Sequence, residues 1–490
     1  MPALRLRALA LLWLAVAALT AARAAERRPN FLFVYTDDQR WDAMGVVQRE
    51  HGERGRYPWF TTPAMDRLAA EGLRFRNAFV TLSLCAPSRA AFLTGRYNHL
   101  NGIANNHTPF PEASVTHATL LRSAGYTTGY IGKWHMGNQR GPRPGFDYSA
   151  SFVGQGRYVD CPVEVNGEST PTKGWIDDVS TDYAIGFLRQ NRDKPFSLIV
   201  GFKACHGPTT PPERAANRFA DQKARRVPNL GLRAPFRDEA DIAPAKSAPA
   251  AAAGPEVPVN LNYFRCVSAA DDNLGRLLAT LDELGLAEDT VVVFTSDNGY
   301  YQGEHNLGDK RSLYDESLRI PLLVRYPRAI ARGRIADELV INVDLAPTFL
   351  DLAGVPVPHE MQGRSWRPLF AARDGAPRPS WREAFLAVYF QETGYPQTPT
   401  MVAVRTTGAK LIRYTGHDDW TELFDLAADP YETRNLARDP AHAVLLAQMS
   451  ATFDREAKAV AYTVPVYADQ PGVDDAAGKK KGTKNKKKSE

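Results

Sequence analysis

The chain has few cysteines and no long apolar run beyond its N-terminal segment, and each absence excludes a class of protein. Four cysteines in 490 residues are too few for a disulfide scaffold, and a chain of this length can bury a sufficient core without one. After the N-terminal segment, no run of residues is long and apolar enough to span a bilayer. No internal repeat and no motif for binding RNA or DNA is present. We therefore expect a globular protein of two or three units that acts neither as a membrane channel nor on nucleic acid.

The two ends of the chain differ in composition from its body. Residues 1–24 have a positively charged start, an apolar stretch at 9–19 and an Ala-Arg-Ala site at 22–24, a pattern typical of a signal peptide. We therefore expect an exported protein, periplasmic or extracellular. Residues 466–490 contain seven lysines. The net charge of +5 comes from this tail and from the arginines of the N-terminal segment, and the rest of the chain is mildly acidic. We interpret this tail as a disordered, solvated segment, with binding to an acidic polymer or a membrane surface as the alternative.

Short apolar runs alternate with helical patterns between residues 25 and 382, which we assign to one domain. Four β-branched or aromatic runs each end in a cluster of polar residues, at 30–36, 127–131, 197–202 and 291–296. Helical spacing is present at 62–73, 117–125, 177–190 and 261–284. This alternation predicts an α/β domain with a large, mostly parallel sheet, whose ligands bind beyond the carboxyl ends of the strands. We therefore expect the four polar clusters to form one site.

Two further regions depart from this alternation. Residues 208–258 are rich in Pro, Arg and Ala and partly of low complexity, and we interpret them as an inserted surface loop that rims the site. Residues 383–465 contain short alternating runs at 401–405 and 410–414, followed by a helical pattern at 441–457. These patterns predict a C-terminal subdomain made of a small antiparallel sheet with a helix.

One cysteine lies in a motif of specific spacing. Cys85-Ala-Pro87-Ser-Arg89 is followed by a run that ends in Leu-Thr-Gly-Arg96, which predicts a helix behind a turn. Alone, such a cysteine could be a buried structural residue, a disulfide partner or a thiolate nucleophile. The motif resembles the signature of the formylglycine-dependent sulfatases, in which it directs conversion of the cysteine to an aldehyde. This resemblance implies the alkaline-phosphatase-like three-layer sandwich, and a formylglycine-generating enzyme as a partner during maturation.

The chemistry of sulfate ester hydrolysis explains why an aldehyde would replace the thiol. The nucleophile must attack sulfur and must afterwards release the sulfate easily. A hydrated aldehyde carries two hydroxyls on one carbon, so that one attacks and the other expels sulfate by re-forming the carbonyl. The resemblance therefore implies a sulfuric ester hydrolase that releases inorganic sulfate.

Hard oxygen donors follow two of the expected strands. Asp37 and Asp38 follow the first, and Asp297 and Asn298 follow the last. Such ligands suit Ca²⁺ or Mg²⁺ and not a soft metal. The resemblance implies one calcium ion at these four positions, with the modified Cys85 beside it as a further ligand. The ion would polarise the sulfate oxygens and lower the pKa of the attacking hydroxyl.

Lysine and histidine residues complete the expected site. Singly, an exposed lysine is usually solvated and a lone histidine is usually structural. The resemblance implies that Lys133 and Lys310, with Arg89, neutralise the sulfate oxygens as charge develops. It also implies that His206, assisted by Lys310, protonates the departing alcohol, and that His135 accepts the proton of the second hydroxyl.

Three further runs bear on the substrate. Residues 105–111, 202–208 and 299–305 are similar to those of bacterial mucin-desulfating and N-acetylglucosamine-6-sulfatase relatives, which implies a sulfated glycan. Specificity like that of iduronate-2-sulfatase or an arylsulfatase stays open. The alternative enzyme is a phosphatase or phosphodiesterase of the same fold, although those use Ser or Thr and a two-zinc site. The alternative outside the enzymes is a secreted protein that binds sulfated polysaccharide without turnover.

Three cysteines remain once Cys85 is set apart, namely Cys161, Cys205 and Cys266. Because three is an odd number, at least one of these thiols stays unpaired. The spacing does not determine which one.

Overall fold

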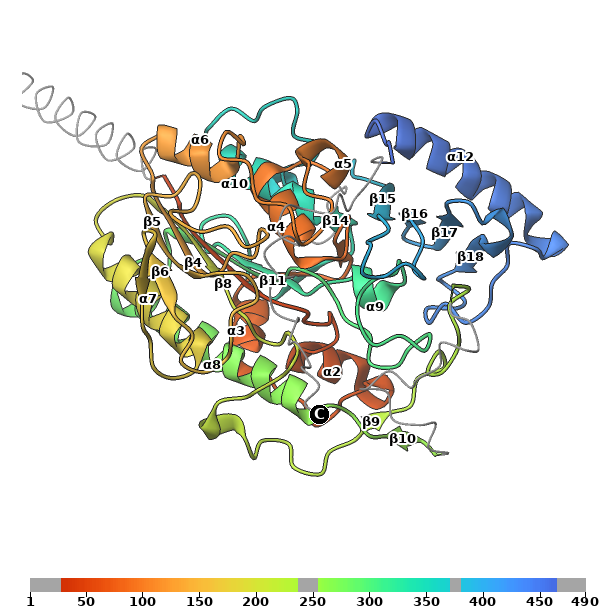
Figure 1. Cartoon of the computed structure of the whole chain (residues 1–490), viewed down its shortest axis with the longest axis horizontal. Coiled ribbons are helices and arrows are strands. Elements are labelled where there is room, and N and C mark those ends of the chain that lie inside the picture. Colours follow the sequence, from red (N-terminus) through yellow and green to blue (C-terminus); the bar gives the residue numbers. More distant parts are fainter. Residues whose placement is uncertain (1–27, 237–253, 371–379, 465–490) are drawn as a thin grey trace, which may run out of the picture.

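The computed structural model describes residues 28–236, 254–370 and 380–464, which form a large sheet between helices and a small sheet beside it (Figure 1). The large sheet has ten strands in the order β13-β2-β12-β11-β1-β8-β4-β5-β6-β7. Their bounds are β1 Asn30–Thr36, β2 Leu73–Phe75, β4 Thr127–Lys133, β5 Tyr148–Phe152, β6 Val163–Val165, β7 Glu168–Thr170, β8 Phe196–Gly201, β11 Thr290–Ser296, β12 Leu322–Arg325 and β13 Arg334–Ala336. The predicted signal peptide and the lysine-rich tail lie outside the described residues.

The four strands expected from the sequence are neighbours at the centre of the sheet. β11, β1, β8 and β4 are adjacent and parallel. Antiparallel pairs lie outside this block, between β11 and β12, β12 and β2, β5 and β6, and β6 and β7. β4 runs two residues beyond the predicted 127–131 because its end pairs with β5, Lys133 opposite Phe152. The mostly parallel α/β sheet is confirmed.

Helices cover both faces of the large sheet, so the domain has three layers (Figure 1). Alternate residues of β1 enter different cores, with Phe31, Phe33 and Tyr35 on one face and Leu32 and Val34 on the other. The first face packs against α4 (Cys85–Thr94), α6 (His117–Ser123) and α10 (Leu345–Leu352). The second face packs against α3 (Pro63–Glu71), α7 (Ile176–Gln190) and α8 (Leu261–Glu283). A strand that is buried on both faces has a continuous run of apolar residues in its sequence, and such runs predicted these strands.

The C-terminal region forms the expected small antiparallel sheet with a helix. Its strands pair in sequence order, and α12 packs across three of them (Figure 1). The bounds are β15 Ala384–Tyr389, β16 Met401–Thr406, β17 Ala409–Tyr414, β18 Glu422–Asp425 and α12 Ala443–Ala459. The remaining short elements are α2 Gly45–His51, η1 Gly52–Arg54, β3 Ala78–Phe79, α5 Asn98–Asn101, η2 Glu213–Ala215, β9 Ala224–Arg225, β10 Glu256–Val257, α9 Asp315–Leu318, β14 Val340–Ile341, η4 Asn342–Asp344, α11 Arg367–Phe370, η5 Asp418–Trp420 and η6 Pro440–His442.

The region interpreted as an inserted loop has little regular structure where it is described. Residues 208–236 and 254–258 contain one 3₁₀ turn, η2, and the short antiparallel pair of β9 with β10. Residues 237–253 of the predicted insertion lie outside the described residues. Of the helices in the described ranges, none combines the length and the apolar character that crossing a membrane requires.

Buried charges join the small sheet to the segment that carries Lys310. Lys410 of β17 is fully buried, and its Nζ lies 2.6 Å from Asp315 Oδ1 and 2.7 Å from Glu432 Oε1. Arg405 Nη2 lies 2.8 Å from the other oxygen of Asp315, the first residue of α9. Burial alone would raise the pKa of Asp315, but Arg405 and Lys410 hold it well below its usual value. The small sheet is therefore fixed to the large domain by charges that are largely removed from water.

Replacing Lys410 by alanine should lower the free energy of unfolding by about 3–5 kcal/mol, because the buried Glu432 loses its cation and Asp315 keeps only Arg405. Urea denaturation measures this loss. The matched control is Arg434→Ala, which removes a surface pair with Asp439 at 2.8 Å and should cost less than about 1 kcal/mol. Equal effects of the two substitutions would contradict a role for buried ion pairs in holding the small sheet.

Candidate active site and metal centre

The four central strands bring polar side chains to one edge of the large sheet. Because the strands are parallel and adjacent, their carboxyl ends meet at that edge. The side chains found there are Asp37 and Asp38 after β1, Asp297 and Asn298 after β11, Lys133 at the end of β4, His135 beyond it, and His206 beyond β8. All are buried except His206, whose side chain keeps 20% of its surface exposed. The structure thus assembles residues that are far apart in sequence.

Cys85 is the first residue of α4 and lies among these groups. Its thiol donates to Asp37 Oδ1 at 3.3 Å, and Lys310 Nζ lies 3.2 Å from its sulfur. Burial, reinforced by the charge of Asp37, raises the pKa of Cys85 to about 12. At neutral pH the unmodified side chain is therefore a protonated thiol and a poor nucleophile. All four cysteines are buried and unpaired, so no disulfide competes for Cys85.

Arg89 lies one helical turn after Cys85 and points at carboxylates. Its Nε and Nη2 donate to Asp297 Oδ2 at 2.9 and 2.7 Å, and Nη2 also lies 3.2 Å from Asp37 Oδ2. Its Nη1 donates to the carbonyl of Lys133 at 2.5 Å. Four hydrogen bonds thus occupy most of the five donors of the guanidinium. The geometry differs from the expected contact with sulfate oxygens, because the two carboxylates and a carbonyl take up the donors instead.

Two lysines place positive charge beside the same carboxylates. Lys133 Nζ donates to Asp37 Oδ2, and Lys310 Nζ donates to Asp38 Oδ1 as well as contacting Cys85. Both lysines are buried. Burial alone would lower the pKa of Lys310, but Asp38 and Cys85 raise it well above its usual value. Lys310 therefore keeps its charge next to the sulfur of Cys85.

The oxygen ligands fit a divalent cation. Carboxylate oxygens of Asp37, Asp38 and Asp297 lie within 4.8 Å of one another. Asn298 Nδ2 donates to Asp38 Oδ1 at 2.6 Å, whereas its buried Oδ1 has no hydrogen-bond partner among the described residues. A buried, unpaired amide oxygen beside three carboxylates is the donor set that a hard cation binds. Burial, then the charge of Asp37, raises the pKa of Asp297 to about 6, and a bound cation would oppose both effects by favouring the ionised carboxylate.

The two histidines differ in exposure and in their neighbours. His206 Nε2 lies 3.9 Å from Asp38 Oδ2, and a ring nitrogen of His206 lies within 4.8 Å of the sulfur of Cys85. His135 is buried, and its Nδ1 has no partner among the described residues. Burial, then Lys133, lowers the pKa of His206 to about 4 and that of His135 well below its usual value. In the free protein both imidazoles are therefore neutral at pH 7.

The sequence did not single out two residues that hold this arrangement. Gln155 Oε1 accepts from Lys133 Nζ at 2.5 Å, and the residue stands between two glycines of positive φ. Asp177, in the first turn of α7, accepts the backbone N–H groups of residues 203 and 204 at 2.7 and 2.9 Å. It thereby orients the loop that leads to His206. The available signals were the Gly-Gln-Gly sequence and an acidic residue at a helix start.

Comparisons with known proteins show which families and relatives this chain is similar to. The family model described as Sulfatase matches residues 29–355, and the model for the C-terminal region of N-sulphoglucosamine sulphohydrolase matches 303–459. The chain is 34% identical to an N-acetylglucosamine-6-O-sulfatase of Bacteroides thetaiotaomicron, over 87% of this chain and 86% of that protein. It is 27% identical to human N-acetylglucosamine-6-sulfatase, over 85% and 82%.

A solved structure is also similar to this chain. It is that of another protein, described as being in complex with its substrate D-glucosamine-2-N,6-O-disulfate, and it superposes on this chain with a TM-score of 0.78 at 31% identity. The match covers 89% of this chain and 98% of that one. With the family model matching most of the large domain and a relative similar along most of its length, the chain belongs to the sulfatase family and is a hydrolase of that family.

Proposed function

We propose that this chain hydrolyses sulfate esters of a sulfated glycan, with N-acetylglucosamine 6-sulfate as the sugar it recognises. Two relatives carry the name N-acetylglucosamine-6-sulfatase or its 6-O form, and a similar protein was solved with a 6-sulfated glucosamine. The observation that carries the proposal is the position of Cys85, at the start of α4, between Asp37 and Lys310. The signal peptide expected at 1–24 supports an exported enzyme that meets such glycans outside the cytoplasm.

Cys85 needs conversion to formylglycine to act as the nucleophile. Its raised pKa leaves almost no thiolate at neutral pH, so the unmodified residue has little reactivity. The signature from Cys85 to Arg96 supports conversion by a formylglycine-generating enzyme during maturation. The hydrated aldehyde supplies one hydroxyl to attack sulfur and a second whose deprotonation drives release of sulfate.

Asp37, Asp38, Asp297 and Asn298 would hold one Ca²⁺, with residue 85 beside it. The ion would polarise the sulfate oxygens and favour ionisation of the attacking hydroxyl. Arg89 acts on this centre through its hydrogen bonds, because it fixes the orientation of Asp37 and Asp297. We therefore assign Arg89 to positioning the ligands rather than to binding the sulfate.

Lys133 and Lys310 provide the positive charge for the sulfate itself. Lys310 contacts the sulfur of Cys85, so an ester attacked at this position would meet its ammonium group. Lys133 is buried on the other side of Asp37 and is held there by Gln155. Because these charges are already in place in a site that excludes water, they stabilise the charge that develops on the sulfate oxygens and need not move during the reaction.

The histidines are placed to move the two protons. His206 has the exposed imidazole, and its position near Cys85 and Asp38 suits protonation of an alcohol that departs toward solvent. The negative charges of the bound ester and of Asp38 favour the imidazolium form. His135 is buried and neutral with a free Nδ1, which suits acceptance of the proton from the second hydroxyl.

Replacing Cys85 by alanine should reduce turnover by at least about 10³-fold, because the nucleophile is lost. The free energy of unfolding should change by less than about 1.5 kcal/mol. Cys266→Ala, which removes an equally buried thiol in α8, is the control and should retain activity. Peptide mass spectrometry identifies the side chain at residue 85, and full activity in protein that retains the thiol there would refute the mechanism.

Replacing Asn298 by alanine should weaken Ca²⁺ binding by about tenfold or more, since even outer partners of metal ligands contribute that much. Added Ca²⁺ should raise the thermal unfolding midpoint of the unsubstituted protein, and the rise should shrink in the variant. Asn191→Ala, at the end of α7, should leave the rise intact. Stoichiometric zinc in elemental analysis, with activity that zinc alone restores, would favour the phosphatase alternative.

The two histidine variants should fail in different half-reactions. His206→Ala should slow sugar sulfates by about 10²-fold and nearly spare aryl sulfates, whose alcohols leave with little protonation. His135→Ala should release one equivalent of alcohol rapidly and then turn over slowly, because sulfate release is impaired. Rapid-quench kinetics with both substrate types measures both effects. A burst in the His206 variant and none in the His135 variant would mean that the two roles are exchanged.

A further inference from the structure

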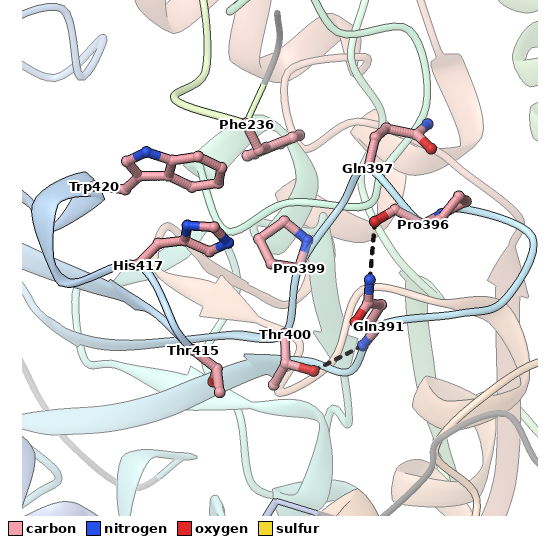
Figure 2. A pocket seen from close by; sticks show the side chains of 9 residues that line it. All are labelled: Phe236, Gln391, Pro396, Gln397, Pro399, Thr400, Thr415, His417 and Trp420. Carbon is pink, nitrogen blue, oxygen red and sulfur yellow. Dashed lines mark hydrogen bonds between the residues drawn. The ribbon is translucent and has the colours of Figure 1, made fainter.

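The small sheet carries a pocket that no part of the proposed mechanism uses. Its volume is about 330 Å³, in the range of pockets that bind small ligands. It is lined by Phe236, Gln391, Pro396, Gln397, Pro399, Thr400, Thr415, His417 and Trp420. Figure 2 shows Trp420 and His417 on one side and Gln397 and Pro396 on the other, with Phe236 and Pro399 between them. Phe236 comes from the predicted insertion and the other residues from the C-terminal subdomain, so two separate regions form one pocket.

Flat ring faces form the walls of the pocket. His417 stacks on Trp420 with ring centroids 3.8 Å apart and an angle of 6° between the rings. Tyr414 of β17 contacts two of these aromatic residues, with its ring centroid 6.0 Å from that of Trp420 and 6.2 Å from that of Phe236. Rigid aromatic faces offer the apolar contact that the C–H face of a sugar ring can make.

Polar groups at the pocket remain available to a ligand. Gln391 is engaged, because its Nε2 donates to the carbonyl of Pro396 at 2.8 Å and its N–H donates to Thr400 Oγ1 (Figure 2). By contrast, the side chains of Gln397, His417 and Trp420 have no hydrogen-bond partner among the described residues, and none of them is fully buried. An amide, an imidazole and an indole N–H around aromatic walls suit the hydroxyls of a sugar.

The charge around the pocket disfavours a sulfated ring. None of its lining residues is a lysine, an arginine or a carboxylate. The residues next to it, Asp418 and Asp419, are exposed acids that would repel a sulfate group. The candidate active site differs, since Lys133 and Lys310 provide positive charge there. The candidate active site therefore suits a sulfated sugar of a glycan, and the pocket suits an unsulfated sugar of the same glycan.

One loop connects the pocket to the candidate active site. It joins β15 to β16 and carries Glu392, whose Oε2 lies 2.6 Å from Arg311 Nε. The guanidinium of Arg311 also lies 3.5 Å from the ring centroid of Tyr395 in the same loop. Arg311 directly follows Lys310, the residue that contacts Cys85. The loop that lines the pocket is thus held by the side chain of Arg311, the residue that directly follows Lys310.

We propose that this pocket binds an unsulfated sugar of the glycan, next along the chain from the sugar whose ester is cleaved. That ring packs on the outer face of Trp420, whose other face is held by the stacked imidazole of His417, and Gln397 binds the sugar hydroxyls. The enzyme accordingly prefers an oligosaccharide to a sulfated monosaccharide. This inference rests on the proposed function, because it assumes that the substrate is a sulfated glycan.

The test compares two substrates, N-acetylglucosamine 6-sulfate and a disaccharide in which the same sugar is joined to an unsulfated one. Trp420→Ala should lower kcat/KM for the disaccharide by about three- to tenfold, the loss expected for an aromatic stacking contact, and leave the monosaccharide unchanged. Trp420→Phe should retain most of the disaccharide activity. His417→Ala should behave like Trp420→Ala, whereas His359→Ala, at an imidazole 92% exposed outside the pocket, should affect neither substrate.

Equal losses on both substrates would mean that Trp420 only supports the fold, and no loss on either would mean that the pocket holds no sugar. A titration with the unsulfated disaccharide separates this inference from the proposed function. It should change tryptophan fluorescence in the unsubstituted protein and not in Trp420→Phe. This fluorescence change would support sugar binding in the pocket even if the protein cleaved no sulfated sugar. Absence of cleavage would refute the proposed function and not the assignment of the pocket. Absence of the fluorescence change, or binding only of sulfated sugars, would overturn the pocket's assignment.

Discussion

The architecture of the site depends on holding three carboxylates together away from water. An ionised carboxylate costs several kcal/mol to bury, and like charges a few ångströms apart disfavour each other's ionisation. Asp37, Asp38 and Asp297 are nevertheless buried side by side, because three cations are bonded to them. Those cations are Arg89, Lys133 and Lys310. With all six groups ionised their charges cancel, so a bound divalent cation would leave the site positive and attractive to an anionic sulfate ester.

This balance explains why the site is built from separate parts of the fold. The carboxylates follow two adjacent strands, Arg89 comes from the helix that begins at Cys85, and Lys133 comes from the end of β4. The segment between β11 and α9 provides both Asp297 and Lys310, whereas the other charges come from separate segments. The parallel block β11-β1-β8-β4 is therefore a functional requirement as well as a packing solution, since it brings the carboxyl ends to one edge.

Much of this could be predicted from the sequence, for reasons that differ between residues. The strand at residues 30–36 is a continuous apolar run because both its faces are buried, and the position of Asp37 at its end follows directly. The orientation of Arg89 could not be predicted, because its partners come from strands 52 and 208 positions away. Gln155 and Asp177 act only through folded neighbours, and a single glutamine or aspartate in a sequence carries no specific signal. The pocket at Trp420 was missed because Phe236 and the small sheet meet only in the folded chain.

The central claim is that residue 85 acts as formylglycine beside four oxygen ligands. The most direct measurement produces the protein with increasing amounts of formylglycine-generating enzyme and determines, in each preparation, the fraction of residue 85 converted and the specific activity. The account predicts a proportional relation through zero, because the protonated thiol of Cys85 is unreactive. Specific activity that stays constant while the converted fraction changes would contradict it.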